Sequence, residues 1–449
     1  MSSHTTESIF LKDLYGTDEM RAVFDDKSLL QRWLDAEVAL AQAEGERGII
    51  PVEAAAEIAR KGRAELMDTA RIKQGIDQTV HPIVPLIRVF ASVCDGGAGE
   101  YIHWGATTQD IMDTANVLQL KQALAIFERR LSELAEALAE LAQRYRDTAM
   151  AGRTHGQHAL PITFGFKVAV WLAELQRHRE RLQQCRARLL VGQFAGAAGT
   201  LAALPDCALD VQRRMMEILG LGVPAVAWHT ARDGYAEFSS VLAMLAATLA
   251  KIAHEVILLQ KTELWEVEEP FNEGKVGSST MPHKRNPMLC EAIAAAARLA
   301  MNLAPNALDS MMGEHERDWI SDHMDWAYLP DICVLTDGAL ALTVRVMRGL
   351  RVHPEHMARN LQATGGLILS ERVMLALGRR VGRQTAHDAV YECAMRAVDE
   401  ERPFREILLR HPLVAAHLSA AEIDDLLDPH SYTGLSGEFV DRVLAECRR

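Results

Sequence analysis

The sequence predicts an all-α protein built around long amphipathic helices. Aromatic residues make up only 6% of the 449 residues, whereas alanine and leucine are abundant, and this composition favours helices over sheets. Residues 114–151 contain no glycine or proline, and residues 236–269 are equally unbroken. In both stretches, apolar residues recur at steps of three and four, which is a heptad pattern. The repeating positions are Leu124, Phe127, Leu131, Leu134, Leu138 and Leu141, then Phe238, Leu242, Leu245, Leu249, Ile252, Val256 and Leu259.

Helices of this length need several neighbours to cover them, so we expect an elongated bundle that other subunits complete. A purely structural coiled coil is the alternative, and the polar, glycine-containing loops between the helices disfavour it. A third helical run is expected over residues 162–191, and further helices after Pro287 and Pro330.

The remaining segments suggest three domains. Asp25 and Asp26 precede an apolar series that begins at Leu30, which predicts a capped amphipathic helix. Short helical patterns alternate with Gly/Pro breaks up to about Gly105, and proline again becomes frequent after Val352. We therefore expect an N-terminal helical domain at 1–112, a central long-helix domain at 113–351 and a C-terminal helical domain at 352–449.

Composition argues against several classes of protein. The formal net charge is −13, and there is no basic stripe with interleaved aromatics, so nucleic-acid binding is not expected. The seven cysteines show no metal-ligand spacing, which indicates free thiols in a reducing compartment and no metal site. No apolar run is judged long enough to span a bilayer, and no secretory leader is recognisable, so we expect a cytoplasmic protein.

Three polar segments lie at or beside the ends of the long helices. The first, residues 103–110, places Thr107, Thr108 and exposed N–H groups just ahead of a helix, where a carboxylate would bind well. By itself it is more simply an ordinary helix cap. The second, residues 152–161, contains His155 and His158, and either histidine could act as a general acid or as a structural hydrogen-bonding group.

The third polar segment, residues 273–287, is the most specific. Two glycines make its first half pliable, as a closing loop requires, and Ser278 and Ser279 follow. His283, Lys284 and Arg285 come next, and Lys284 is suited to stabilise the doubly charged anion formed when a proton leaves the carbon beside a carboxylate.

This third segment resembles the signature of the fumarase/aspartase superfamily, and the first two segments resemble its other active-site regions in the same order. The resemblance covers essentially the whole chain. It implies a three-domain, all-helical fold in which four subunits form a twenty-helix core. It also implies active sites shared between three subunits, and a reaction that needs no cofactor.

The resemblance also assigns roles to individual residues. Ser278 matches the general base, and His155 matches the general acid, with His81 as a second active-site histidine. Lys284 and Asn286 match groups that bind the substrate carboxylate and stabilise the aci-carboxylate intermediate. The remaining expected substrate contacts are Thr107, Thr108, Thr154, Gln157, Ser279, Arg232, Arg317 and Tyr15.

Within the superfamily, the chain resembles the branch of adenylosuccinate lyase and 3-carboxy-cis,cis-muconate cycloisomerase. His155 favours the lyase, because typical cycloisomerases resemble Thr-Trp-Leu-Gln there. Adenylosuccinate itself fits poorly. Leu14 stands where those lyases have an arginine for phosphate, Asp322 stands in place of a serine, and Ala231 and Gly234 replace a Gln and an Arg.

The leading hypothesis is a lyase that splits an N-substituted aspartate into fumarate and an amine. The alternatives are a carboxymuconate cycloisomerase and a non-catalytic structural protein, comparable to the lens crystallins related to argininosuccinate lyase. The apparently complete set of Ser278, Lys284, Asn286 and His155 argues against the last of these. The sequence names neither the amine nor the pathway.

Overall fold

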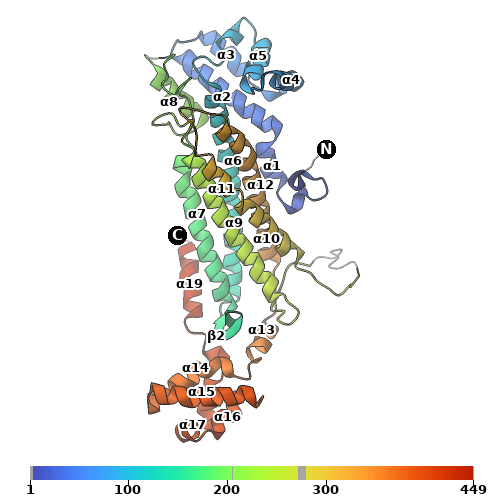
Figure 1. Ribbon diagram of the computed structural model, residues 1–449, viewed down its shortest axis with the longest axis vertical. Helices are drawn as coiled ribbons and strands as arrows, with labels where there is room; N and C mark the ends of the chain where they lie inside the picture. Colours follow the sequence, from blue (N-terminus) through green and yellow to red (C-terminus); the bar gives the residue numbers. More distant parts are fainter. Residues whose placement is uncertain (1–3, 205, 272–279, 448–449) are drawn as a thin grey trace. The chain divides into compact units, whose positions relative to one another are not determined.

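The computed structural model describes residues 4–204, 206–271 and 280–447. Within these residues, helices form almost all of the regular structure, and the strands make two small antiparallel pairs (Figure 1). The all-α class predicted from the sequence is therefore confirmed.

The chain divides into two compact units, each treated separately below. The first comprises Met1–Leu131, Arg177–Ala250 and Ala292–Leu342, and the second comprises Ser132–Gln176, Lys251–Glu291 and Thr343–Arg449. The helices that contribute residues to both units are α6 (Thr108–Arg144), α7 (Phe164–Leu189), α9 (Asp233–Leu259), α10 (Met288–Met301) and α12 (Ile320–Gly349). The division into three domains stays a prediction.

The other helices and strands each fall within one unit. The first unit contains α1 (Asp18–Phe24), α2 (Asp26–Glu46), α3 (Val52–Lys61), α4 (Thr69–Thr79), α5 (Ile83–Val93), α8 (Ala208–Leu219) and α11 (Ala304–Asp309). The second contains β1 (Ala149–Thr154), β2 (Gln157–Thr163), β3 (Val267–Glu268), β4 (Arg351–Val352), α13 (Pro354–Leu361), α14 (Ser370–Val381), α15 (Arg383–Asp399), α16 (Phe404–Arg410), α17 (Pro412–His417), α18 (Ala420–Leu426) and α19 (Ser436–Cys447).

Helix α2 begins where the sequence predicted a capped helix. The Asp25 side chain accepts a hydrogen bond from the Ser28 backbone N–H at 2.7 Å, which satisfies one of the free N–H groups of the first turn. The apolar face of α2, including Leu34 and Leu40, is buried, and α2 packs against α3 and α8. This packing forms the core beneath the candidate site of the first unit.

The two unbroken stretches of the sequence are α6 and α9, but both helices end earlier than expected. Residues Ala149–Ala151 pair with Thr163–Pro161 in the β1–β2 hairpin, so their backbone groups are bonded to a strand and not to the preceding turn of α6. After Leu259, a turn leads to β3, which pairs with β4. The third predicted run is α7.

Three helical stretches are long and apolar enough to cross a membrane by length and composition alone, namely Asp233–Leu259, Met288–Asp309 and Ile320–Gly349. The sequence-based statement that no run is long enough was therefore wrong by this criterion. Within Asp233–Leu259, the apolar residues Phe238, Leu242, Leu245 and Leu249 are buried in the first unit. The heptad pattern accounts for the apolar character of these four positions.

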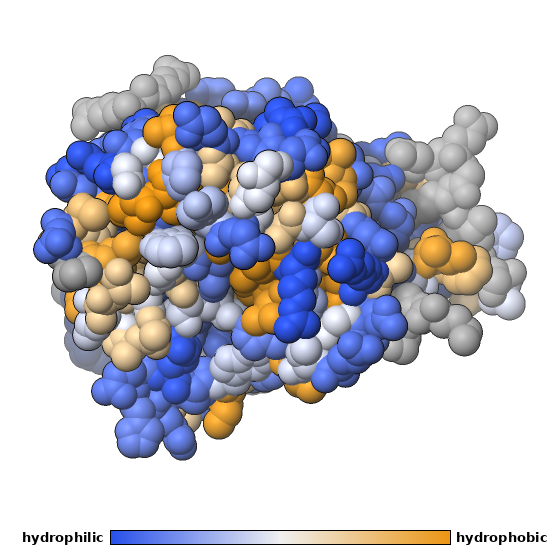
Figure 2. Space-filling model, turned by 90° about the horizontal axis from the view of Figure 1, so that it is seen from above, coloured by the Kyte–Doolittle hydropathy of each residue, from blue (hydrophilic) through white to orange (hydrophobic). Residues whose placement is uncertain are grey.

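Apolar side chains also reach the surface. Figure 2 shows hydrophobic residues in separate patches among hydrophilic ones on the face that it presents. Along α10, α11 and the segment that follows, the exposed large apolar residues are Met288, Leu299, Met301, Leu308, Met311, Met312 and Ile320. Larger exposed apolar patches usually mark an interaction surface.

Candidate active site

The predicted site residues fall into both compact units. Tyr15, His81, Thr107, Thr108, Arg232 and Arg317 belong to the first, whereas Thr154, His155, Gln157, Lys284 and Asn286 belong to the second. Ser278 and Ser279 lie outside the described residues, so their roles stay predictions.

In the first unit, Asp110 organises the start of α6. Its buried carboxylate accepts the backbone N–H groups of Thr107, Ala195 and Gly196 at 2.9–3.0 Å, and Nε2 of His229 donates to it at 2.8 Å. Three segments far apart in the sequence are thereby joined beside Thr107 and Thr108. The N-terminus of α6, with two hydroxyl groups beside it, is suited to a carboxylate ligand.

His81 lies directly against this helix start. Its Nε2 is 3.1 Å from the Thr108 hydroxyl, and its Nδ1 accepts the backbone N–H of Val84, in the first turn of α5, at 3.2 Å. The ring also lies 5.6 Å from that of Trp319, two residues after Arg317. Burial, assisted by the nearby His103, lowers the pKa of His81. The structure thus brings together two residues that the sequence placed in one site.

His103 contacts a buried carboxylate of α2, and a second buried carboxyl group lies further along the same helix. Nδ1 of His103 is 2.7 Å from Oε1 of Glu37, a buried residue of α2. Burial alone would lower the pKa of His103, but the carboxylates of Glu37 and Asp110 outweigh that effect and raise it. Glu44, two turns further along α2, is also fully buried, and burial together with the charge of Glu37 raises its pKa to about 9.

Arg232 is fully buried among three aspartates. Its guanidinium lies 2.6 Å from Asp113, 2.8 Å from Asp322 and 3.5 Å from Asp325. A substrate contact by Arg232 would have to displace one of these carboxylates, so its predicted binding role competes with a structural one. Burial raises the pKa of Asp322 to about 7. Asp322 is thus engaged with Arg232.

Arg317 and Tyr15 also lie in the first unit. Nη1 of Arg317 is buried and has no hydrogen-bond partner among the described residues, so this guanidinium retains donor capacity for an anion. Tyr15 is half-buried, and α12 passes very close to it. A Cβ added to Gly338 would come within 2.6 Å of the Tyr15 carbonyl carbon.

In the second unit, His155 occupies the tip of the β1–β2 hairpin. His155 and Gly156 both have positive φ, at 54° and 76°, and they connect the paired residues Thr154 and Gln157. A left-handed backbone is uncommon for a residue other than glycine and is often associated with function. Arg153 fixes the base of the tip through two hydrogen bonds to the buried Glu266, at 2.7 and 3.0 Å. His155 is exposed on a firmly held turn.

Lys284 and Asn286 lie in the last part of the third polar segment, and neighbouring residues anchor them. Nη1 of Arg285 contacts Glu268 at 2.9 Å, and its guanidinium lies over the ring of Phe271. The Glu269 carboxylate accepts the Leu289 and Cys290 N–H groups and so caps α10. Lys284 is left exposed on a turn, whereas Asn286 is half-buried.

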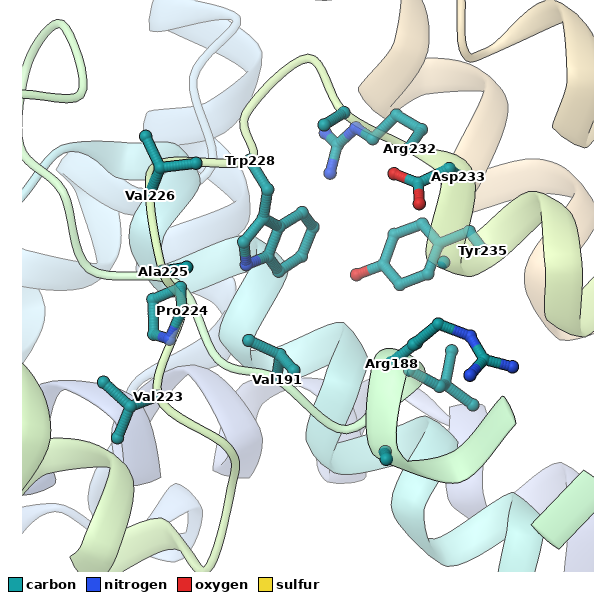
Figure 3. Close-up of a pocket in the computed structure, with 14 residues that line it drawn as sticks. Arg188, Val191, Val223, Pro224, Ala225, Val226, Trp228, Arg232, Asp233 and Tyr235 are labelled. Atoms are coloured by element: carbon teal, nitrogen blue, oxygen red, sulfur yellow. The ribbon is translucent and has the colours of Figure 1, made fainter. Parts of the chain in front are cut away.

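A cavity of about 380 Å³ opens beside the segment that precedes α9 (Figure 3). Its wall includes the rings of Trp228 and Tyr235, which meet edge to face with centroids 5.7 Å apart. Ala231 and Gly234 also line it. Small residues at these two positions leave the cavity more room than a Gln and an Arg would.

Several organising residues were missed from the sequence. Asp110 accepts the N–H of Thr107, Glu37 contacts His103, and Glu266 holds Arg153 at the base of the hairpin tip. Glu37 had a signal, because it interrupts the apolar face formed by Leu34 and Val38. The partner of Asp110 lies 119 residues away at His229, and no local pattern indicates such a pairing.

Comparisons with known proteins identify the family of this chain. The pattern of the family described as Lyase matches residues 15–301, and that of the Adenylosuccinate lyase C-terminus matches residues 366–443. The N-acetyl-S-(2-succino)cysteine lyase of Dickeya dadantii (strain 3937) is 43% identical over 99% of this chain and 98% of its own length. The adenylosuccinate lyase of Methanothermobacter thermautotrophicus is 44% identical over 97% and 98%.

Among solved structures, the 3-carboxy-cis,cis-muconate lactonizing enzyme of Pseudomonas putida superposes with a TM-score of 0.92. Its sequence is 42% identical, and the match covers 98% of this chain and 99% of that one. The chain therefore belongs to the fumarase/aspartase superfamily of lyases, in the branch of adenylosuccinate lyase and 3-carboxy-cis,cis-muconate cycloisomerase.

Proposed function

We propose that this chain reversibly splits a small N-substituted aspartate into fumarate and an amine. The observation that carries the proposal is the presentation of His155 in a left-handed turn at the exposed tip of a braced hairpin. An amine nitrogen needs a proton in order to leave, because an unprotonated nitrogen would depart as a very strong base. A histidine is the natural donor near neutral pH.

The reaction assigns a task to each predicted residue. Thr107, Thr108 and the N-terminus of α6 bind one carboxylate, with Arg317 as a further donor. Ser278 removes the β-proton anti to nitrogen, and Lys284 and Asn286 stabilise the resulting aci-carboxylate. The C–N bond then breaks, its electrons pass to nitrogen as the C=C bond of fumarate forms, and His155 protonates the nitrogen. Ser278 takes one proton and His155 gives one to the departing amine, so the elimination balances without a cofactor.

A second candidate replaces nitrogen with sulfur. It is favoured by the 43% identity to the N-acetyl-S-(2-succino)cysteine lyase of Dickeya dadantii, over nearly the full length of both chains. A thiol has a pKa of about 8.5, so a thiolate can depart without a general acid. The likeness to the lactonizing enzyme keeps the cycloisomerase as a third candidate, and His155 disfavours it.

We further propose that the enzyme is a cytoplasmic homotetramer whose active sites combine segments of three subunits. The exposed apolar residues of α10 and α11 support an extensive subunit interface. The seven free cysteines are consistent with a reducing compartment. No membrane, metal or nucleic-acid partner is proposed.

One assay separates these candidates. The purified protein is incubated with fumarate and matched panels of amines and thiols, and the loss of fumarate absorbance is followed; 3-carboxymuconate is tested in parallel. Consumption of fumarate with amines supports the leading proposal, and consumption with thiols alone supports the second. Turnover only of 3-carboxymuconate contradicts both. The Ser278→Ala variant should reduce turnover by about 10²–10⁴-fold or more, the effect of losing a positioned base.

Adenylosuccinate is not expected to be the main substrate. Leu14 offers no donor for a phosphate, and Arg232 is already engaged by three carboxylates. The small residues Ala231 and Gly234 add space and no charge. The test is the ratio of kcat/KM values for adenylosuccinate and simple N-substituted aspartates at equal pH and salt. An advantage for adenylosuccinate of more than about tenfold, or roughly 1.4 kcal/mol in barrier, would overturn this expectation.

A further inference from the structure

The two nitrogens of the His81 ring have different partners, and these partners determine where its proton lies. Nδ1 is 3.2 Å from the Val84 backbone nitrogen, which can only donate, so Nδ1 must be an acceptor. A neutral imidazole carries one proton, and it must therefore be on Nε2. Nε2 lies 3.1 Å from the Thr108 hydroxyl and consequently donates to its oxygen.

This bond determines the direction of the Thr108 hydroxyl proton. Because the oxygen of Thr108 accepts from His81, its own hydrogen points elsewhere. The hydroxyl belongs to the first residue of α6, where the backbone N–H groups also lack helical partners. The hydroxyl and the helix N-terminus can thus donate together to one carboxylate.

The surroundings of His81 oppose a second proton on the ring. A proton on Nδ1 would face the N–H of Val84 at hydrogen-bond distance. The ring also lies at the N-terminal end of α5, an eleven-residue helix whose partial positive charge there disfavours a cation. Among its neighbours, Trp319 is uncharged, and a proton on His103 would repel a second proton on His81. Burial and His103 both lower the pKa of His81.

We propose that His81 is a positioning residue, not a proton donor: it stays neutral and orients the Thr108 hydroxyl toward the substrate carboxylate. This inference rests on the proposed function, because it requires a dicarboxylate ligand. It leaves His155 as the acid that serves the leaving group.

Two substitutions at His81 test the roles of its two ring nitrogens separately. In His81→Asn, the side-chain amide oxygen can replace Nδ1 and still cap α5, but the side chain no longer reaches Thr108. In His81→Gln, the amide nitrogen can replace Nε2 and still donate to Thr108. The two variants are therefore matched controls, with Thr108→Val and Thr108→Ser marking the loss and the retention of the hydroxyl.

The experiment measures succinate and fumarate affinity by calorimetry on the intact oligomer, together with the pH profile of kcat/KM. Thr108→Val should weaken dicarboxylate binding by about 10- to 100-fold, the range for a hydrogen bond to a charged group. We expect His81→Asn to approach that loss, and His81→Gln and Thr108→Ser to stay within a few-fold of the wild type. The double variant His81→Asn/Thr108→Val should bind no more weakly than Thr108→Val. The alkaline limb of the pH profile should be unchanged in His81→Gln.

Two results would overturn the proposal. One is a large loss of kcat in His81→Gln with its alkaline limb removed and its dicarboxylate affinity intact, which would identify His81 as the acid. The other is unchanged affinity in His81→Asn. Failure of the wild type to bind either dicarboxylate would instead refute the proposed function, and the inference with it.

Discussion

Some residues at or beside the candidate site have a left-handed backbone. Val80 has φ 53° at the C-terminal end of α4, a conformation that is costly for a β-branched residue. His103, His155 and His315 also have positive φ. Val80 directly precedes His81, so this strained turn helps to position the His81 ring that contacts Thr108. We interpret this backbone strain as a consequence of placing the His81 ring against Thr108.

We predict that Val80→Asn stabilises the protein. Asparagine tolerates the left-handed conformation, and the Val80 side chain is 73% exposed, so little apolar burial is lost. The gain should be about 1 kcal/mol. Thermal unfolding at equal protein concentration measures it, with Val80→Ala as the control that removes only the β-branch. A variant no more stable than the wild type would show that the turn is unstrained.

Glu44 is a second residue with a measurable consequence. Its pKa rises from an ordinary value of 4.5 to about 9, chiefly because of burial, so the folded protein binds a proton that the unfolded chain releases. Stability from this proton is complete below about pH 4.5 and is lost as pH rises toward 9.

Glu44→Gln should remove this pH dependence, because the amide has no proton to lose. The stability of the variant relative to the wild type should increase steadily between pH 5 and 9. Chemical denaturation at a series of pH values checks this, and Glu53→Gln, at an exposed position on α3, is the control. A constant difference across the series would mean that Glu44 is already ionised in the folded state.

At the scale of elements, long helices were predictable and short strands were not. The heptad patterns located α6 and α9, because helix periodicity extends over many turns. The β1–β2 hairpin was missed, since its strands have only six and seven residues and its turn is His155-Gly156 in place of the usual Asn-Gly. Its motif was nonetheless singled out, because residue types carry chemistry even where they do not indicate geometry.

The site shows the same division between local and distant information. Thr107, Thr108 and His81 were named from short motifs, and the structure brings His81 and Thr108 into contact. The carboxylates around Arg232 come from α6 and α12, 119 and 90 residues away. Their pairing depends on tertiary packing, which no local pattern encodes.

The hairpin allows the function of His155 to be separated from its structural role. We predict that His155→Asn retains the fold, because asparagine also adopts the left-handed conformation, but that it loses about 10²-fold or more in turnover with an amine leaving group. Activity and thermal unfolding are measured together. His155→Val, which disfavours positive φ, should in addition destabilise the protein. Full activity in the Asn variant would exclude His155 as the acid.

At the scale of the whole molecule, several apolar residues of α10, α11 and the segment after them are exposed to solvent. Leu308, in α11, is 55% exposed, and Met312, three residues after α11, is 74% exposed. Subunit association, as expected for this superfamily, would bury them. The proposed sharing of active sites can be tested through the same association.

We predict that two inactive variants restore activity when they are mixed. Ser278→Ala and His155→Asn chains, dissociated together and reassembled, should form some sites in which both residues are intact. Sedimentation measures the tetramer, and turnover measures the recovery; each variant reassembled alone is the control. Sedimentation as a monomer, or mixed tetramers without activity, would contradict shared sites.

The residues that line the cavity beside α9 differ in how well they should tolerate substitution. Arg232 and Tyr235 are buried, and Arg232 is paired with buried carboxylates. Substitutions at these two residues should therefore destabilise the fold. Val223 and Val226 are exposed. Substitutions at exposed positions usually change the free energy of unfolding by less than about 0.5 kcal/mol. Changes of ligand preference at this cavity should therefore arise at Val223 and Val226 and not at Arg232.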